Sequence, residues 1–174
     1  MIVDRGDPAM GGEGVPVLDS TPRASTVVIG IGNPDRGDDA VGRRVATRLR
    51  GRVPEAVTVV EEDGEATRLL ERLGGTASAI LVDATISGAA VGTIRRVDVT
   101  RDPLPPVKSG ASTHGLGLAE ALELARVLGS LPPRCVVYAV EVRSFEPGSA
   151  LSPEVAAAAD EVVVRVLAEL RDGS

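Results

Sequence analysis

The sequence predicts a three-layer α/β/α sandwich around a mostly parallel, twisted sheet of about five strands, one of them antiparallel. Short apolar runs rich in Val and Ile alternate with segments in which apolar residues recur at helical spacing. Glycine, proline or acidic residues follow most of these runs, as is typical where a strand or helix ends. Because strands that alternate with helices indicate a parallel sheet covered on both faces, we expect an α/β domain.

The first strand and helix are expected within residues 26–42, TVVIGIGNPDRGDDAVG. Residues 27–29 form an apolar run that is too short for a helix and typical of a strand buried on both faces. Gly30 and Gly32 let the backbone turn and approach another segment closely. Asp38 is expected to cap the following helix. The apolar face of that helix consists of Val41, Val45 and Leu49.

The later elements follow the same alternation. Further buried strands are expected at residues 56–60, 79–83 and 136–142. Residues 93–99 are more polar, so we expect an antiparallel strand at or near an edge of the sheet. Helices are expected at residues 64–73, at residues 118–128 and after Ser152. The predicted core face of the last helix consists of Val155, Ala159, Val163, Val166 and Leu170.

Length and composition indicate one globular domain at residues 26–172, preceded by a disordered leader at residues 1–25. The net charge is −6, with one Tyr, one Phe and no Trp, which argues against a nucleic-acid partner. No apolar run approaches the roughly 20 residues that span a bilayer, and no signal peptide is recognisable. The single cysteine excludes an intrachain disulfide and a thiolate metal cluster. We therefore expect a cytoplasmic protein without a membrane partner, and a monomer.

Three residues could carry chemistry together. Asp39 starts the first helix, Asp83 ends the third strand, and His114 is the only histidine. In a parallel sheet, strand ends and the starts of the following helices lie along one edge, so these distant residues can meet there. Two carboxylates and an imidazole suit zinc or nickel, and they could equally position a water molecule for attack on a carbonyl group.

Each of these residues also has an ordinary structural explanation. Asp39 could stabilise a helix dipole, and Asp83 could cap the turn that follows its strand. A single histidine in a loop, such as His114, is usually a surface residue or a local hydrogen-bond partner. Their predicted placement on the same edge of the sheet favours a site.

A nucleotide site competes with this interpretation. The spacing of Gly30 and Gly32 matches the first two glycines of the dinucleotide-binding motif G-x-G-x-x-G. The second strand ends with Glu61 and Glu62, at the position where an acid would bind a ribose. However, Asp35 replaces the third glycine, and the neighbouring acids would repel a pyrophosphate. The nucleotide interpretation therefore has little support.

Nucleophilic catalysis has still less support. There is no G-x-S-x-G motif, and Cys135 heads an apolar run, which is typical of a small buried side chain. Glu141 and Arg143 follow the last strand and are expected to be structural or substrate-orienting.

The segment GIGNPDRGDDAVG at residues 30–42 resembles the G-x-G-N-x-x-x-x-D-[DE]-x-x-G signature of hydrogenase maturation proteases. Residues 81–84 (LVDA) and 112–118 (STHGLGL) resemble later parts of the same family, as do residues 145–155. The resemblance covers about residues 26 to 170. It implies a phosphorylase/hydrolase-like fold and an endopeptidase, of the aspartic or a metal-dependent type.

The resemblance also implies a substrate and roles for individual residues. The enzyme would remove the C-terminal extension of a nickel–iron hydrogenase large-subunit precursor after nickel insertion, and use the nickel held by the precursor as its recognition element. Asp39 and Asp83 would activate water or contact the metal, and His114 would contact the metal. Asn33 and Asp38 would hold the loop.

Two alternatives remain open at this point. A non-proteolytic nickel-handling or hydrogenase assembly protein could use the same scaffold and keep the three candidate ligands. A nucleotide-binding module could use residues 30–37, and would be stabilised by NAD or ATP.

Overall fold

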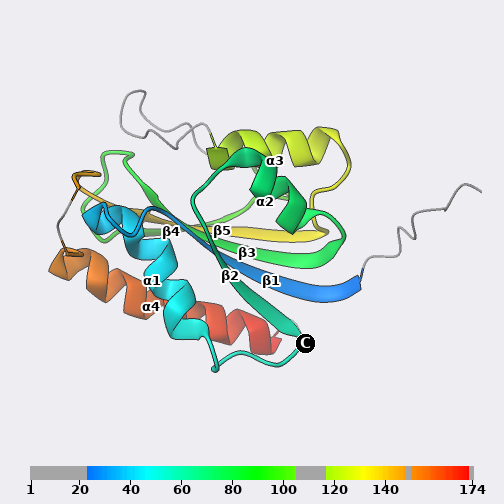
Figure 1. Cartoon of the computed structure of the whole chain (residues 1–174), viewed down its shortest axis with the longest axis horizontal. Coiled ribbons are helices and arrows are strands. Elements are labelled where there is room, and N and C mark those ends of the chain that lie inside the picture. Colours follow the sequence, from blue (N-terminus) through cyan, green and yellow to red (C-terminus); the bar gives the residue numbers. More distant parts are fainter. Residues whose placement is uncertain (1–22, 105–116, 148–149, 173–174) are drawn as a thin grey trace, which may run out of the picture.

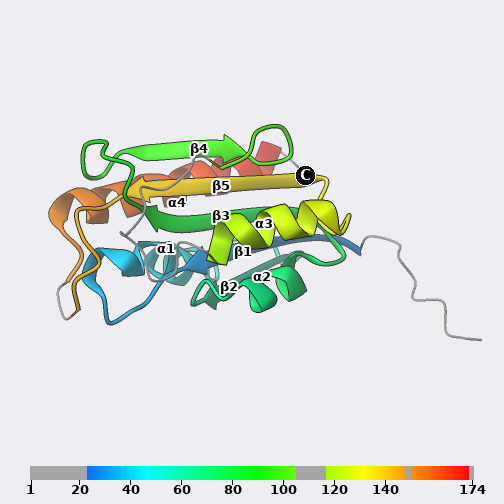
Figure 2. The same ribbon diagram turned by 90° about the horizontal axis from the view of Figure 1, so that it is seen from above.

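The computed structural model describes residues 23–104, 117–147 and 150–172. They form a five-stranded sheet in the order β2-β1-β3-β5-β4, in which β4 alone runs antiparallel to its neighbour (Figure 2). The strands are β1 (Arg23–Ile31), β2 (Val57–Glu62), β3 (Thr76–Thr85), β4 (Ile94–Asp98) and β5 (Arg134–Glu141). The helices are η1 (Gly37–Ala40), α1 (Val41–Leu49), α2 (Ala66–Leu73), α3 (Gly117–Val127) and α4 (Pro153–Asp172). The predicted α/β fold with one antiparallel edge strand is confirmed.

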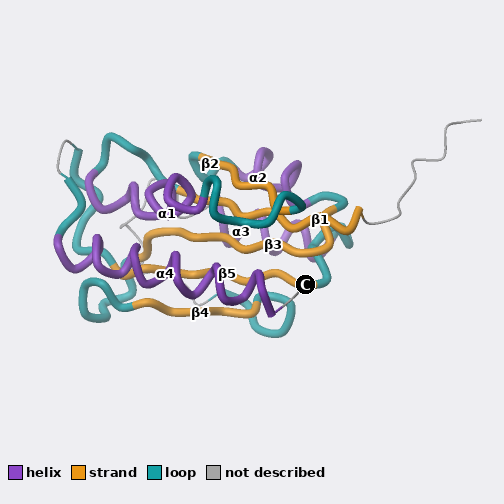
Figure 3. Tube along the Cα trace, turned by 90° about the horizontal axis from the view of Figure 1, so that it is seen from below, coloured by secondary structure: helices purple, strands orange, loops and turns teal. Residues whose placement is uncertain are grey.

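Helices cover both faces of the sheet. Figures 1 and 3 show α1 and α4 on one face, and Figure 1 shows α2 and α3 on the other. Alternate residues of each central strand point to opposite faces, so Val28 and Ile80 pack under α1 and α4, whereas Ile29 and Leu81 pack under α2 and α3. The predicted core faces of α1 and α4 are buried as expected. No described helix is both long and apolar enough to cross a membrane.

Some boundaries and contacts differ from those predicted. β1 begins at Arg23, within the range that the sequence assigns to the leader. Asp38 does not cap the helix that follows β1: it lies inside the 3₁₀ turn η1, and its carboxylate accepts hydrogen bonds from Ser152. Leu128, predicted on the apolar face of α3, lies just beyond that helix and is 65% exposed. The helix ends there because the amide of Ser130 donates to the carbonyl of Ala125, which turns the chain away.

Two glycines allow α1 to pack closely on the sheet. A Cβ atom built on Gly30 of β1 would lie 2.2 Å from the carbonyl oxygen of Gly42 in α1. A Cβ atom on Gly42 would lie 2.2 Å from the carbonyl oxygen of Val82 in β3. Any side chain at either position would therefore push the helix away from β1 and β3. The same approach brings η1, which precedes α1, into contact with β3.

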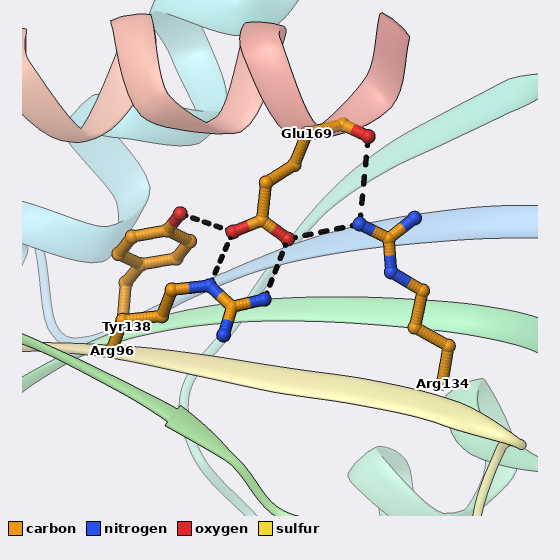
Figure 4. Close-up of polar contacts among 4 residues, drawn as sticks. All are labelled: Arg96, Arg134, Tyr138 and Glu169. Carbon is orange, nitrogen blue, oxygen red and sulfur yellow. Dashed lines mark hydrogen bonds and ion pairs between the residues drawn. The ribbon is translucent and has the colours of Figure 1, made fainter. Parts of the chain in front are cut away.

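A polar cluster ties the end of α4 to β4 and β5 (Figure 4). The Glu169 carboxylate accepts hydrogen bonds from Arg96 Nε at 2.6 Å, from Arg134 Nη2 at 3.0 Å and from the Tyr138 hydroxyl. Desolvation and the bond to Glu169 raise the pKa of Tyr138 to about 12, so the phenol remains a donor at neutral pH. Arg134 is the first residue of β5, which places the Glu169 cluster toward the amino ends of the parallel strands.

The close packing of α1 can be tested with Gly42→Ala. The added Cβ atom would overlap backbone atoms of β1 and β3, which cannot rotate away, so we expect the free energy of unfolding to fall by about 2–3 kcal/mol. Urea denaturation measures this change. Gly74→Ala is the matched control, because a Cβ there would meet its nearest atom at 3.4 Å. Its unfolding free energy should change by less than about 1 kcal/mol. Equal effects of both substitutions would contradict the packing argument.

Candidate active site

The carboxyl ends of β1, β3 and β5 lie at one edge of the sheet, because these strands are parallel. The loops that follow them gather at this end of the molecule, on the left in Figures 1 and 2. Asp39 lies in η1, directly after β1, and Asp83 lies near the end of β3. The two predicted carboxylates are therefore brought to the same edge. His114 lies outside the described residues.

Asp39 is held by the backbone of its own loop. Its residue is 6% exposed, and its Oδ2 accepts a hydrogen bond of 3.0 Å from the Asn33 amide. The Asp39 amide in turn donates to the Arg36 carbonyl at 2.9 Å. The Asn33 side chain accepts a bond of 2.9 Å from the Asp35 amide, which shapes the turn. Asn33 thus contributes its backbone to Asp39 and its side chain to the loop.

Asp83 has a carboxyl group that is easily protonated. Its pKa is raised to about 7, mainly by desolvation; a hydrogen bond of 2.9 Å from the Ala84 amide lowers the pKa, and the negative charge of Asp39 raises it. Asp39 and Asp83 are therefore close enough to interact electrostatically. Two acids in this relationship favour a state in which one is ionised and the other holds a proton.

Asp38 connects this loop to the last helix. Its Oδ1 accepts a bond of 2.6 Å from the Ser152 amide, and its Oδ2 accepts a bond of 3.0 Å from the Ser152 hydroxyl. Ser152 immediately precedes Pro153, the first residue of α4. Since Asp38 is adjacent to Asp39, this contact fixes the backbone that carries the candidate catalytic acid.

The glycines and acids that suggested a nucleotide site have partners within the protein. Gly32 has φ +139°, and a Cβ there would lie 1.8 Å from the Asp39 carbonyl oxygen, so this glycine serves the turn. Glu62 is buried and accepts a bond of 2.7 Å from Arg72, while Glu61 accepts one of 2.8 Å from Arg50. These contacts assign structural roles to the residues that resembled a dinucleotide fingerprint.

The donor set suits a cation but is only partly described. Within residues 23–104, 117–147 and 150–172, no three His, Cys, Asp or Glu side chains come together as metal ligands. The predicted set of Asp39, Asp83 and His114 includes a residue outside these ranges, so it stays a prediction. The two acids offer hard oxygen ligands whose mutual repulsion a cation would relieve. The same pair could instead hold and transfer a proton.

The raised pKa of Asp83 has a consequence for stability. Between pH 4 and pH 7 the unfolded chain ionises this residue while the folded chain keeps it protonated, so stability falls as pH rises through this window. Asp83→Asn removes this penalty. We expect the variant to be more stable than wild type by roughly 2–4 kcal/mol at pH 8, and equally stable near pH 3.

Urea denaturation of wild type and variant across this pH range checks the expectation. Asp102→Asn, at an exposed position, is the control, and its difference from wild type should not follow the same course. A difference for Asp83→Asn that does not grow with pH would contradict the desolvation of this carboxyl group.

Comparisons with known proteins point to one family. The model of a family described as hydrogenase maturation protease matches residues 43–169, which include Asp83 and His114 and begin just after Asp39. The chain is 31% identical over 151 residues to hydrogenase 2 maturation protease of Escherichia coli K12, a match that covers 84% of this chain and 90% of that protein. Hydrogenase expression/formation protein HupM of Azotobacter chroococcum is 28% identical over 152 residues, which cover 84% of this chain and 71% of that protein.

Solved structures agree with this assignment. The hydrogenase maturating endopeptidase HybD from Escherichia coli superposes with a TM-score of 0.72 at 29% identity, over 86% of this chain and 94% of that chain. The solution structure of an endopeptidase from Escherichia coli gives a TM-score of 0.76 at 28% identity, with the same coverage of 86% and 94%. An acid pair at the carboxyl edge of this fold, together with these similarities, leads to one conclusion: the chain belongs to the hydrogenase maturation protease family and is a peptidase.

Proposed function

We propose that this peptidase removes the C-terminal extension of a nickel–iron hydrogenase large-subunit precursor, and that it recognises the nickel which the precursor already holds. Family membership supports the class of substrate. The observation that carries the proposal is the electrostatic pairing of Asp39 with the desolvated carboxyl group of Asp83 at the carboxyl edge of the sheet. We expect the enzyme to act as a monomer in the cytoplasm.

The pair can divide the work of peptide hydrolysis. In the proposed mechanism the ionised carboxylate takes a proton from a water molecule as its oxygen attacks the scissile carbonyl carbon. The protonated carboxyl group then gives its proton to the departing amide nitrogen as the C–N bond breaks. A carboxyl pKa of about 7 for Asp83 supports the second role, because about half of this group is still protonated near neutral pH. Asp39, held by the Asn33 amide, suits the first role.

As an alternative to this acid–base division, the same residues are proposed to contact the nickel of the substrate. Carboxylate oxygens of Asp39 and Asp83 and the imidazole of His114 would complete the coordination of an ion that the precursor holds with its own ligands. One observation supports this: the negative charge of Asp39 raises the pKa of Asp83, so a divalent ion between the two acids would relieve their mutual repulsion. Recognition would then depend on whether the precursor has received its metal.

A second function has one observation in its favour. HupM is named an expression/formation protein rather than a protease, and it resembles this chain over most of its length. A non-proteolytic assembly protein would bind the nickel-loaded precursor without cutting it. The two functions therefore differ in the product they leave.

A cleavage assay tests the proposal. The purified protein is mixed with nickel-loaded or nickel-free large-subunit precursor from the same organism, and the released C-terminal fragment is identified by mass spectrometry. We expect only the nickel-loaded precursor to be cut. Asp39→Asn and Asp83→Asn should slow the reaction by about 10²–10⁴-fold, as is typical when an acid–base group is lost, and His114→Ala should weaken binding of the loaded precursor.

Asp102→Asn serves as the control, because it removes an exposed carboxylate and should cleave at the wild-type rate. Binding of the loaded precursor without release of a fragment would favour the assembly function. Cleavage that is unaffected by Asp39→Asn and Asp83→Asn would place the chemistry elsewhere.

A further inference from the structure

A further buried carboxylate lies at the same edge of the sheet, and it binds backbone amides. Glu141, the last residue of β5, is 3% exposed. Its Oε1 accepts hydrogen bonds of 2.8 Å from the Ser87 and Gly88 amides, and its Oε2 accepts one of 2.8 Å from the Ser87 hydroxyl. Bonds from N–H and O–H donors to a charged carboxylate are among the stronger hydrogen bonds in proteins. Glu141 therefore holds the segment that joins β3 to β4.

The backbone of Glu141 holds the other end of this segment. Its carbonyl accepts a bond of 2.8 Å from the Gly92 amide, and its amide donates one of 2.8 Å to the Thr93 carbonyl. Gly92 has φ +82° and lies against the first turn of α4, where a Cβ would be 2.9 Å from the Glu154 carbonyl oxygen. Residues 86–92, which we call the β3–β4 loop, are thus fixed at both ends by one residue and backed by α4.

The β3–β4 loop starts next to Asp83. Glu141 of β5 lies beside Thr85 of β3, and Thr85 is two residues after Asp83 in the same strand. Side chains two residues apart in a strand lie on the same face of the sheet. Sheet geometry therefore separates the Cα atoms of Glu141 and Asp83 by roughly 8 Å. The loop begins at residue 86, immediately after β3, on the edge where the catalytic pair lies.

The outer part of the loop is exposed and carries almost no side-chain bulk. Gly88, Ala89 and Ala90 are exposed, while Ile86 and Val91 pack against the core. Small side chains let another polypeptide backbone approach closely, and a loop that is already ordered loses little entropy when it binds. These features suit a surface against which an extended peptide lies.

We propose that the β3–β4 loop is a fixed wall of the substrate site and that Glu141 is the positioning residue that holds it there. This inference rests on the proposed function and adds a specificity element to it. The substrate's main chain beside the scissile bond would lie along Gly88, Ala89 and Ala90, directed toward Asp83. Glu141 itself would not touch the substrate, because its carboxylate is engaged by the loop from within.

Glu141→Gln tests the role of the carboxylate. The side-chain amide of Gln would face the Ser87 or Gly88 amide with a second N–H group, so the loop would lose at least one bond and its fixed position. In the cleavage assay with nickel-loaded precursor we expect KM to rise about tenfold with kcat little changed, the pattern of lost substrate binding. Ala89→Trp, which places bulk on the exposed side, should raise KM in the same way without lowering the thermal unfolding midpoint.

Glu169→Gln is the matched control. Glu169 is also a carboxylate that accepts several hydrogen bonds (Figure 4), but its partner Arg134 is the first residue of β5, at the opposite end of the strand from Glu141. Its substitution should lower the unfolding midpoint while leaving KM at the wild-type value. Hydrogen–deuterium exchange of the full chain gives a second readout: the precursor should slow exchange at residues 88–90 in wild type, and Glu141→Gln should speed it in the free protein.

The outcomes separate the two proposals. The proposal that the β3–β4 loop lines the substrate site would be contradicted if both Glu141→Gln and Ala89→Trp left KM unchanged. It would also be contradicted if the precursor did not slow hydrogen–deuterium exchange at residues 88–90. If the precursor slowed exchange at these residues but was never cut, the loop would be a binding surface for the precursor, and the proposed cleavage of this substrate would be wrong.

Discussion

Helix α1 can lie against β1 and β3 only because Gly30 and Gly42 have no side chains. A Cβ atom at either position would meet backbone atoms first and, at Gly30, also the Cβ of Ala46, none of which can rotate away. This approach sets the height of η1 above the sheet and so brings Asp39 within electrostatic range of Asp83. The electrostatic interaction between Asp39 and Asp83 therefore depends on how closely α1 packs on the sheet.

The other contacts at this edge hold the loops that surround the two acids. Asp38 and Glu141 are buried carboxylates that accept hydrogen bonds from N–H and O–H groups of Ser152 and Ser87. These bonds hold the backbone of the loops in place. Asp39 receives a backbone amide as well. At the other end of the sheet the Glu169 cluster uses arginines instead, which pair charge with charge. The two ends of the sheet therefore differ in the partners that their buried carboxylates use: loop N–H and O–H groups at one end and arginines at the other.

Local patterns in the sequence predict most of the fold and part of the site. Periodicity predicts the core faces of α1 and α4, and strand ends predict that Asp39 and Asp83 share an edge, because these features follow from neighbouring residues. Long-range partners could not be predicted: Asp38 binds Ser152, 114 residues away, rather than capping its own helix. Glu141 likewise binds a loop 54 residues earlier, so its position after a strand suggested only a general structural or orienting role.

The bond between Asp38 and Ser152 also bears on when the site can form during synthesis. Ser152 immediately precedes α4, whereas its partner Asp38 belongs to the first loop of the domain. A nascent chain that still lacks α4 already contains β1, its partner strands β2 and β3, and α1, but it cannot yet anchor the loop that carries Asp39. The loop that carries Asp39 can therefore be anchored only after the start of α4 has been synthesised. A chain truncated before Ser152 would contain all five strands, but the loop that carries Asp39 would lack its bond to the start of α4.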